Sequence, residues 1–123
     1  MICVVRLGPG EGLRIGTVRG PPRGLPKSRW GELFDVWLPE LSPSQALVSK
    51  WLQANSDAER RRFARRFRSE LKAPGPARLL DLLAAMSHGA DFSIGCYCEH
   101  ESQCHRSVLR AVLRERGGKV SAD

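Results

Sequence analysis

The chain has 123 residues, 41% hydrophobic and 27% charged, a balance that excludes global disorder and allows one modest core. Its formal net charge of +7 attracts anions such as nucleic acid or a phosphorylated metabolite, although arginine outnumbers lysine 16 to 4, a bias that genome composition alone can produce. Clustered cysteines, the lack of a signal-peptide pattern and the lack of a long apolar run predict a cytoplasmic protein, not a secreted disulfide framework or a membrane protein.

Two short apolar segments near the start of the chain predict β-strands. Residues 2–7 are mostly aliphatic and end at a Gly-Pro-Gly turn, which is typical of a buried strand. Residues 13–19 alternate, with Leu13, Ile15 and Thr17 on one side. Both segments are therefore expected in a sheet.

A basic loop is predicted after the second strand. Residues 20–29 contain three prolines and two glycines, which exclude regular structure. This semi-rigid loop could direct its cationic groups at one anion, or it could simply be solvated. The anion-binding candidates, called here the basic-loop residues, are Arg19, Arg23, Lys27 and Arg29.

Helices are predicted through the middle of the chain. Residues 30–41 are apolar, and we expect them to fold over a sheet edge as an irregular segment or short helical turn. Ser42 and Pro43 predict the start of the first helix, with Ser42 as its cap. Ser56 and Glu59 form a capping box that starts the second helix.

The second helix carries one apolar stripe and many arginines. Phe63, Phe67 and Leu71 follow one another at a spacing of four, which predicts a buried face. The remaining faces are either solvated or contact phosphate groups. Their arginines are Arg60, Arg61, Arg62, Arg65, Arg66 and Arg68.

The last third of the chain predicts a helix up to Gly89, a strand over residues 92–98 and a final helix that ends at Gly117. Short buried strands interspersed with helices predict an α/β fold, as one small layered domain over residues 1–118. We expect a short parallel or mixed sheet flanked by helices, with the first strand and the 92–98 strand central. Residues 119–123 are expected to form a frayed tail.

The cysteine cluster follows from this strand and helix. Cys96 and Cys98 share one strand face, and Cys96 is expected to pack as a small core hydrophobe. Cys98 lies at the carboxyl end of the strand, where ligands bind in open α/β sheets. Cys104, His105 and Arg106 fall in the first turn of the last helix, which favours an anion or a thiolate. The predicted catalytic residues are Cys98, Cys104, His105 and Arg106.

Three kinds of chemistry compete at this cluster. A zinc or iron site would use Cys96, Cys98 and Cys104, with His105 or His100 as fourth ligand. A redox pair would join Cys98 to Cys104 across five intervening residues. Cysteine phosphatase chemistry is disfavoured because no arginine follows Cys96 or Cys98 by six residues.

Several motifs together resemble the cysteine-bearing branch of the domain of unknown function 488 family. The cluster itself, Ser93-Ile-Gly-Cys-Tyr-Cys-Glu with Cys104-His-Arg-Ser-Val-Leu, carries most of this resemblance. Nearly the whole chain is covered, because earlier segments also match. They are Arg19 with Pro22-Arg-Gly-Leu and Lys27, Trp37-Leu with Glu40-Leu and Pro43-Ser, and Phe67-Arg with Glu70-Leu.

The resemblance implies an α/β fold but no settled activity. Val18 replaces the family's usual aspartate, Pro21 its usual tryptophan and His100 an acidic residue. Another branch lacks the cysteines, which implies that the fold does not require them and favours a functional role. We therefore predict thiol- or metal-dependent chemistry on an anionic ligand, at a strand–helix junction facing the basic loop. The alternative is a non-enzymatic nucleic-acid-binding module that uses the arginine-rich helix and the basic loop.

Overall fold

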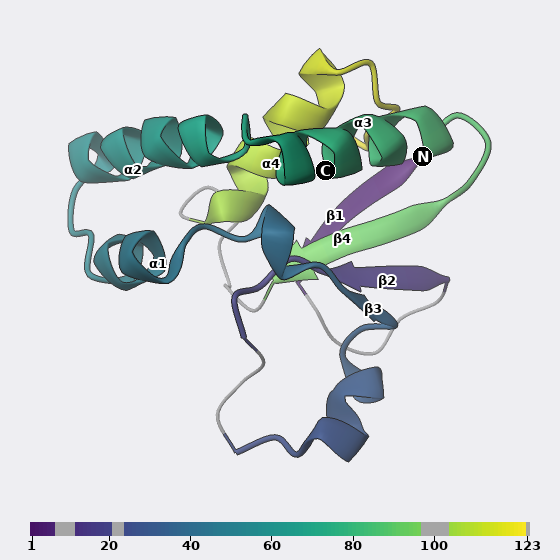
Figure 1. Cartoon of the computed structure of the whole chain (residues 1–123), viewed down its shortest axis with the longest axis horizontal. Coiled ribbons are helices and arrows are strands. Elements are labelled where there is room, and N and C mark those ends of the chain that lie inside the picture. The colour runs from purple at the N-terminus through teal and green to yellow at the C-terminus, as the bar shows by residue number, and fades with distance from the viewer. Residues whose placement is uncertain (7–11, 21–23, 97–103, 123) are drawn as a thin grey trace.

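A four-stranded parallel sheet is the centre of the molecule (Figure 1). The structure, a computed structural model, describes residues 1–6, 12–20, 24–96 and 104–122. The strands within these ranges pair in the order β1-β4-β2-β3, and the α/β fold class is confirmed. They are β1 (Ile2–Arg6), β2 (Leu13–Gly16), β3 (Val36–Trp37) and β4 (Phe92–Cys96).

Strand β4 holds the sheet together because it pairs on both sides. Ile94 lies opposite Val4 of β1 and Ile15 of β2, and all three side chains are buried. The prediction that the first strand is central was wrong: β4 and β2 are central, and β1 lies outside β4. The order of strands depends on pairing between distant segments, which hydrophobic pattern alone does not specify.

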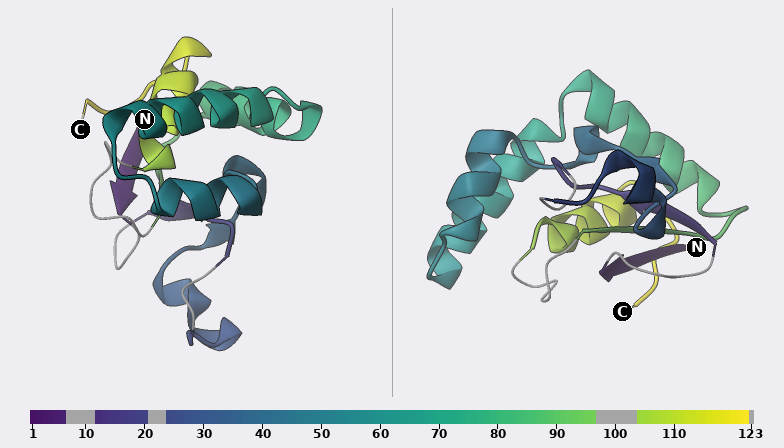
Figure 2. Two further views of the ribbon diagram at one scale, coloured as in Figure 1. Left: turned by 90° about the vertical axis from the view of Figure 1, so that its left-hand side faces the viewer. Right: turned by 90° about the horizontal axis from the view of Figure 1, so that it is seen from below.

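The outer side of β1 is covered by the end of the chain. The backbone N–H of Ile2 donates to the Lys119 carbonyl at 2.7 Å, and that of Ser121 donates to the Ile2 carbonyl at 2.8 Å. Val120 therefore forms a parallel bridge to Ile2 in the segment predicted to fray. Both ends of the chain lie near each other as a result (Figure 2).

Four α-helices and two short 3₁₀ helices complete the described part of the chain. In Figure 1, α2 and α3 lie above the strands, and η1 projects below them. Among the described residues, every helix is too short or too polar to span a membrane. The helices are η1 (Lys27–Glu32), η2 (Pro39–Leu41), α1 (Gln45–Leu52), α2 (Asp57–Glu70), α3 (Pro74–Met86) and α4 (His105–Glu115).

The first two α-helices show what local sequence can and cannot predict. The predicted start of α2 is confirmed, because Ser56 is the N-cap and its Oγ accepts the Glu59 N–H at 3.2 Å. The predicted start of α1 was wrong, since the helix begins at Gln45 and its N-cap, Ser44, makes no side-chain capping bond. The Arg19 guanidinium, from outside the helix, binds the carbonyls of Ser42 and Pro43 and holds that segment extended.

Two clusters of buried side chains form the core. The larger lies between the sheet and the helices and includes Phe63, Phe67 and Leu71, as their spacing predicted. The smaller cluster contains the two cysteines on either side of the β4–α4 connection. Its buried members are Val18, Phe34, Cys96 and Cys104, against which Trp30, Leu33 and Trp37 pack.

Candidate functional site

Two cysteines meet where β4 ends and α4 begins. Cys96 is the last residue of β4 and Cys104 is the N-cap of α4, and their side chains are 1% and 2% exposed. The two Sγ atoms are 2.8 Å apart. A disulfide bond is about 2.05 Å long, whereas two thiolates on one zinc ion lie roughly 3.5–4 Å apart, given zinc–sulfur bonds of about 2.3 Å. The observed spacing lies between these limits, so a small movement reaches either arrangement.

His105, the first residue of α4, lies against this pair. Its Nδ1 is 3.5 Å from Cys104 Sγ, and its Nε2 is 2.8 Å from the Thr17 carbonyl oxygen. Because a carbonyl oxygen only accepts hydrogen bonds, Nε2 must carry a proton. In the neutral imidazole, Nδ1 then carries the acceptor lone pair and faces the thiol of Cys104. The contacts assign Nδ1 as the atom that can accept a thiol proton or bind a metal.

The imidazole orientation is set by two core residues. Phe67 of α2 meets the His105 ring edge to face, with centroids 5.7 Å apart and an interplanar angle of 82°. Thr17, just after β2, is fully buried, and its Oγ1 donates to the Gly95 carbonyl at 3.0 Å. The Thr17 N–H donates to the same carbonyl at 2.9 Å. Thr17 therefore joins the end of β2 to β4 and holds the imidazole with its own carbonyl.

Thr17 is a site residue that the sequence analysis missed. It was assigned only to one side of a strand, since nothing in its local pattern distinguishes it from other strand threonines. The one available signal was its position at the carboxyl end of a predicted strand, where parallel strands present ligands and catalytic groups. Contact with His105 across 88 positions of sequence separation cannot be read from that signal.

Cys96, Cys104 and His105 together form a compact set of metal-binding groups. One possible ligand atom from each residue lies within 4.8 Å of the other two. The Thr17 carbonyl fixes the remaining ring nitrogen, as hydrogen-bond acceptors commonly do for metal-binding histidines. Two sulfurs and an imidazole suit zinc or iron. The residues present therefore fit such an ion as a three-ligand group.

The predicted site residues are only partly brought together. Cys104 and His105 are neighbours, and Arg106 is 3% exposed in the first turn of α4. Cys96 is buried as predicted, but it also contacts Cys104. Cys98 and His100 lie outside the described residues, so the predicted pairing of Cys98 with Cys104 stays a prediction.

The basic-loop residues bind other partners. Arg19 donates from Nε and Nη2 to the Pro43 carbonyl at 3.1 and 2.9 Å and from Nη2 to Ser42 at 3.0 Å. Arg29 pairs with Glu32 of the same short helix at 3.0 Å, and this hydrogen bond lowers the pKa of the Glu32 carboxyl. Lys27 is exposed, and Arg23 lies outside the described residues. The contacts of Arg19 thus support the segment that leads into α1, and that of Arg29 supports its own short helix.

The arginines of α2 divide into paired and exposed groups. Arg60 pairs with Asp57 and Arg68 with Glu115, each at 2.9 Å. The other four α2 arginines are exposed to solvent. These are Arg61, Arg62, Arg65 and Arg66.

This geometry defines a class of protein. It is a small parallel α/β domain with a Cys–Cys–His group at the carboxyl end of β4, one of the two central strands. A family model described as the active DUF488-N3 subclade matches residues 4–117. The chain therefore belongs to this subclade of the domain of unknown function 488 family, as its motifs predicted. No curated protein and no solved structure gives a significant match.

Proposed function

We propose that the protein carries out thiol-dependent redox chemistry, with Cys104 as the reactive thiol and Cys96 as the second thiol. The observation that carries this proposal is the 2.8 Å approach of the two sulfurs beside the Nδ1 atom of His105. A nucleophilic thiol needs a nearby proton acceptor, which in turn needs a group that orients it. Cys104, His105 and the Thr17 carbonyl fill these three roles.

The position of Cys104 supports its assignment as the attacking residue. As the N-cap of α4, it lies at the positive end of the helix dipole, where a thiolate is stabilised. Cys96 is the last residue of β4 and does not cap a helix, so its thiol does not lie at the end of a helix dipole in the way that the Cys104 thiol does. Cys104 therefore attacks first, and Cys96 resolves the intermediate.

The simplest reaction for this pair is thiol–disulfide exchange. Cys104 gives its proton to His105 and attacks one sulfur of a substrate disulfide, which breaks and releases one thiol. Cys96 then attacks Cys104, forms the protein disulfide and releases the second thiol, so that two protein thiols reduce one disulfide. Closing the final bond requires the sulfurs to approach from 2.8 Å to about 2.05 Å.

Mass spectrometry after exposure to oxidised glutathione tests the proposal. We expect an internal disulfide between Cys96 and Cys104, lost in both C96S and C104S and retained in the control variant C3S. C104S should also lose the mixed disulfide with glutathione, whereas C96S should accumulate it. His105→Gln should slow the reaction on the order of 10²-fold, since a positioned base contributes at least that much. A disulfide that survives C96S and disappears in C98S would transfer the second-thiol role to Cys98.

Metal binding is the second candidate function. It is supported by the distance between the sulfur of Cys104 and a ring nitrogen of His105. The 3.5 Å between Cys104 Sγ and His105 Nδ1 is close to the separation of a sulfur and a nitrogen ligand on one tetrahedral zinc ion, about 3.5 Å from standard bond lengths. The ion would be zinc or iron, held by Cys96, Cys104 and His105, with a fourth position for another ligand. Bound there, it would act as a Lewis acid or as a structural link between β4 and α4.

Metal content measured on protein purified without an affinity tag separates the two candidates. A metal site predicts stoichiometric zinc or iron in the wild type and its loss in C104S, with C3S unchanged. Substoichiometric metal, together with thiols that oxidise readily, supports the redox proposal. Stoichiometric metal with thiols that resist glutathione would overturn it.

A further inference from the structure

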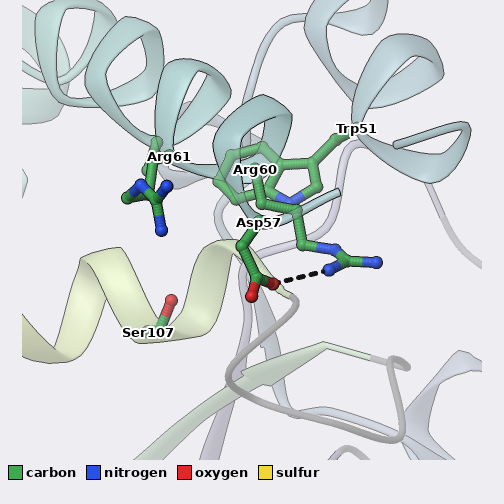
Figure 3. Close-up of a pocket in the computed structure, with 6 residues that line it drawn as sticks. Trp51, Asp57, Arg60, Arg61 and Ser107 are labelled. Carbon is green, nitrogen blue, oxygen red and sulfur yellow. Dashed lines mark hydrogen bonds and ion pairs between the residues drawn. The ribbon is translucent and has the colours of Figure 1, made fainter. Parts of the chain in front are cut away.

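A polar pocket lies on the other side of the first turn of α4 (Figure 3). Ser107 follows His105 by two positions, and two helical positions are about 200° apart, so these side chains leave α4 on nearly opposite sides. The pocket has a volume of about 270 Å³, enough for a small ligand, and is formed by α1, α2 and α4. Its lining residues are Trp51, Asp57, Arg60, Arg61, Ala64 and Ser107.

The charges that line this pocket favour an anion. Two guanidinium groups, from Arg60 and Arg61, oppose the single carboxylate of Asp57. Asp57 pairs with Arg60 at 2.9 Å, and Asp57 is the more exposed partner, at 84% against 24%. Arg61 of α2 and Ser107 of α4 point toward one another across the pocket (Figure 3). The positive end of the α4 dipole lies one turn from Ser107 and adds to this field.

One wall of the pocket contains a hydrogen-bond donor without an acceptor. The Trp51 ring packs against Phe63 and Phe67, with centroids 6.4 and 6.2 Å away. Its Nε1 atom is buried and has no hydrogen-bond partner among the described residues. A buried unsatisfied donor is costly, and such groups often mark a place where a ligand or water belongs. A ligand oxygen bound in the pocket can supply the acceptor.

We propose that this pocket binds a phosphate group. Phosphate offers several strong acceptors to two guanidinium groups and to the Trp51 N–H, and it is favoured at the start of a helix. The Ser107 hydroxyl donates to the Cys104 carbonyl at 2.9 Å and so lines the pocket without supplying a donor to the ligand. The basic composition of the chain predicted an anionic ligand, and the pocket provides a site for it that differs from the basic loop. The phosphate comes either from a small molecule or from a nucleic-acid backbone.

Titration with pyrophosphate, followed by proton–nitrogen NMR, tests the proposal at the pocket itself. The Trp51 indole N–H signal is identified as the one missing from Trp51→Phe. We expect it to shift on addition of pyrophosphate, and not on addition of sodium chloride at equal ionic strength. The thiols are kept reduced and take no part in the signal, so failure of this experiment is distinct from failure of the redox proposal.

Two neighbouring arginines provide a matched pair of variants. Arg61 and Arg62 are both exposed on α2, and only Arg61 lines the pocket. Losing a charge-assisted contact weakens binding about tenfold or more, so we expect this loss in Arg61→Gln and none in Arg62→Gln. Asp57→Asn should strengthen binding, because it removes the opposing carboxylate. An unshifted Trp51 signal, or equal weakening by the two glutamine variants, would overturn the proposal.

A short single-stranded DNA identifies the source of the phosphate. An oligonucleotide that displaces pyrophosphate and loses affinity in Arg61→Gln assigns the pocket to a nucleic-acid phosphate. Pyrophosphate binding that the oligonucleotide does not displace assigns it to a small phosphate-bearing molecule. Both arms are run at two salt concentrations, because contacts with a nucleic-acid backbone weaken steeply with salt.

Discussion

The Cys96–Cys104–His105 group and the basic-loop residues both contain several side chains capable of chemistry. The fold brings the side chains of the first group together, but those of the basic loop contact separate partners. The three members of the first group come from β4 and α4 and converge against Thr17, which follows β2. In the basic loop, Arg19 supports the entry to α1 and Arg29 pairs within its own short helix. The reactive groups of the first region therefore lie next to one another, whereas Arg19 and Arg29 each bind a different part of the backbone or a neighbouring side chain.

The difference follows from the physics of the side chains. An arginine carries a long, flexible stem and can reach carboxylates or carbonyls from many backbone positions. Thiols and imidazole rings are short, so they approach one another only where the backbone elements that carry them are packed together. A cluster of small reactive groups from separate elements is therefore stronger evidence for a site than a run of arginines.

The largest expected effect concerns the core beneath the cysteine group. Phe67 is fully buried and contacts both His105 and Trp51. Phe67→Ala should lower the free energy of unfolding by about 3–5 kcal/mol, through lost burial and a cavity. Chemical denaturation measures this, with Phe67→Leu as a milder variant if the alanine protein does not fold. Leu52→Ala, at a 75% exposed position, should cost less than about 0.5 kcal/mol, and equal losses at the two positions would contradict the expectation.

A smaller effect is expected within the basic loop, where two arginines can be compared directly. Arg19→Ala should cost about 1.5–3 kcal/mol of unfolding free energy, because charge-assisted bonds to the Ser42 and Pro43 carbonyls are lost. Arg29→Ala should have a much smaller effect, since its pair with Glu32 is exposed and screened by solvent. Urea unfolding of both variants checks the prediction. If Arg29→Ala is the more damaging change, the assignment of Arg19 as the structural arginine fails.

Substitutions at Thr17 can separate an effect on the free energy of unfolding from an effect on the rate of the thiol reaction. Thr17→Val keeps the backbone carbonyl that holds His105 Nε2 at 2.8 Å. It removes the hydroxyl bond to Gly95, at a cost of about 1 kcal/mol, and a longer 3.4 Å contact of the hydroxyl with the same Nε2. The rate of disulfide formation with oxidised glutathione should stay unchanged. Thr17→Ser, which retains the hydroxyl, serves as the control for loss of the methyl group. A large fall in the rate for the valine variant alone would show that the hydroxyl also acts on His105.

The smallest effect is a pH dependence at the edge of the sheet. Hydrogen bonds from the Arg14 side chain and backbone lower the pKa of the Asp35 carboxyl. A lowered folded-state pKa contributes stability above the ordinary aspartate pKa, which is lost as the pH falls through the folded value. Asp35→Asn should therefore lose less stability on acidification than the wild type. Unfolding free energies at neutral and acidic pH measure this, and parallel curves would refute it.

Much of the fold followed from local pattern. The α2 stripe at Phe63, Phe67 and Leu71 is buried, and the Ser56 cap forms as expected, because both depend on residues within one helix. Strand β3 was missed, since two residues carry too little periodicity to be recognised. Helix α3 ends at Met86, three residues before the predicted Gly89, within the usual uncertainty of helix ends.

Motif and periodicity are local properties, so they were enough to predict the α/β class, the family, and Cys104 and His105 as chemical candidates. The contact of Cys96 with Cys104, and the role of Thr17 in orienting His105, became visible only in the folded chain. The tertiary structure also decided that Arg19 binds backbone carbonyls. These outcomes depend on which distant segments pack together, and that is settled by burial and hydrogen bonding over the whole domain.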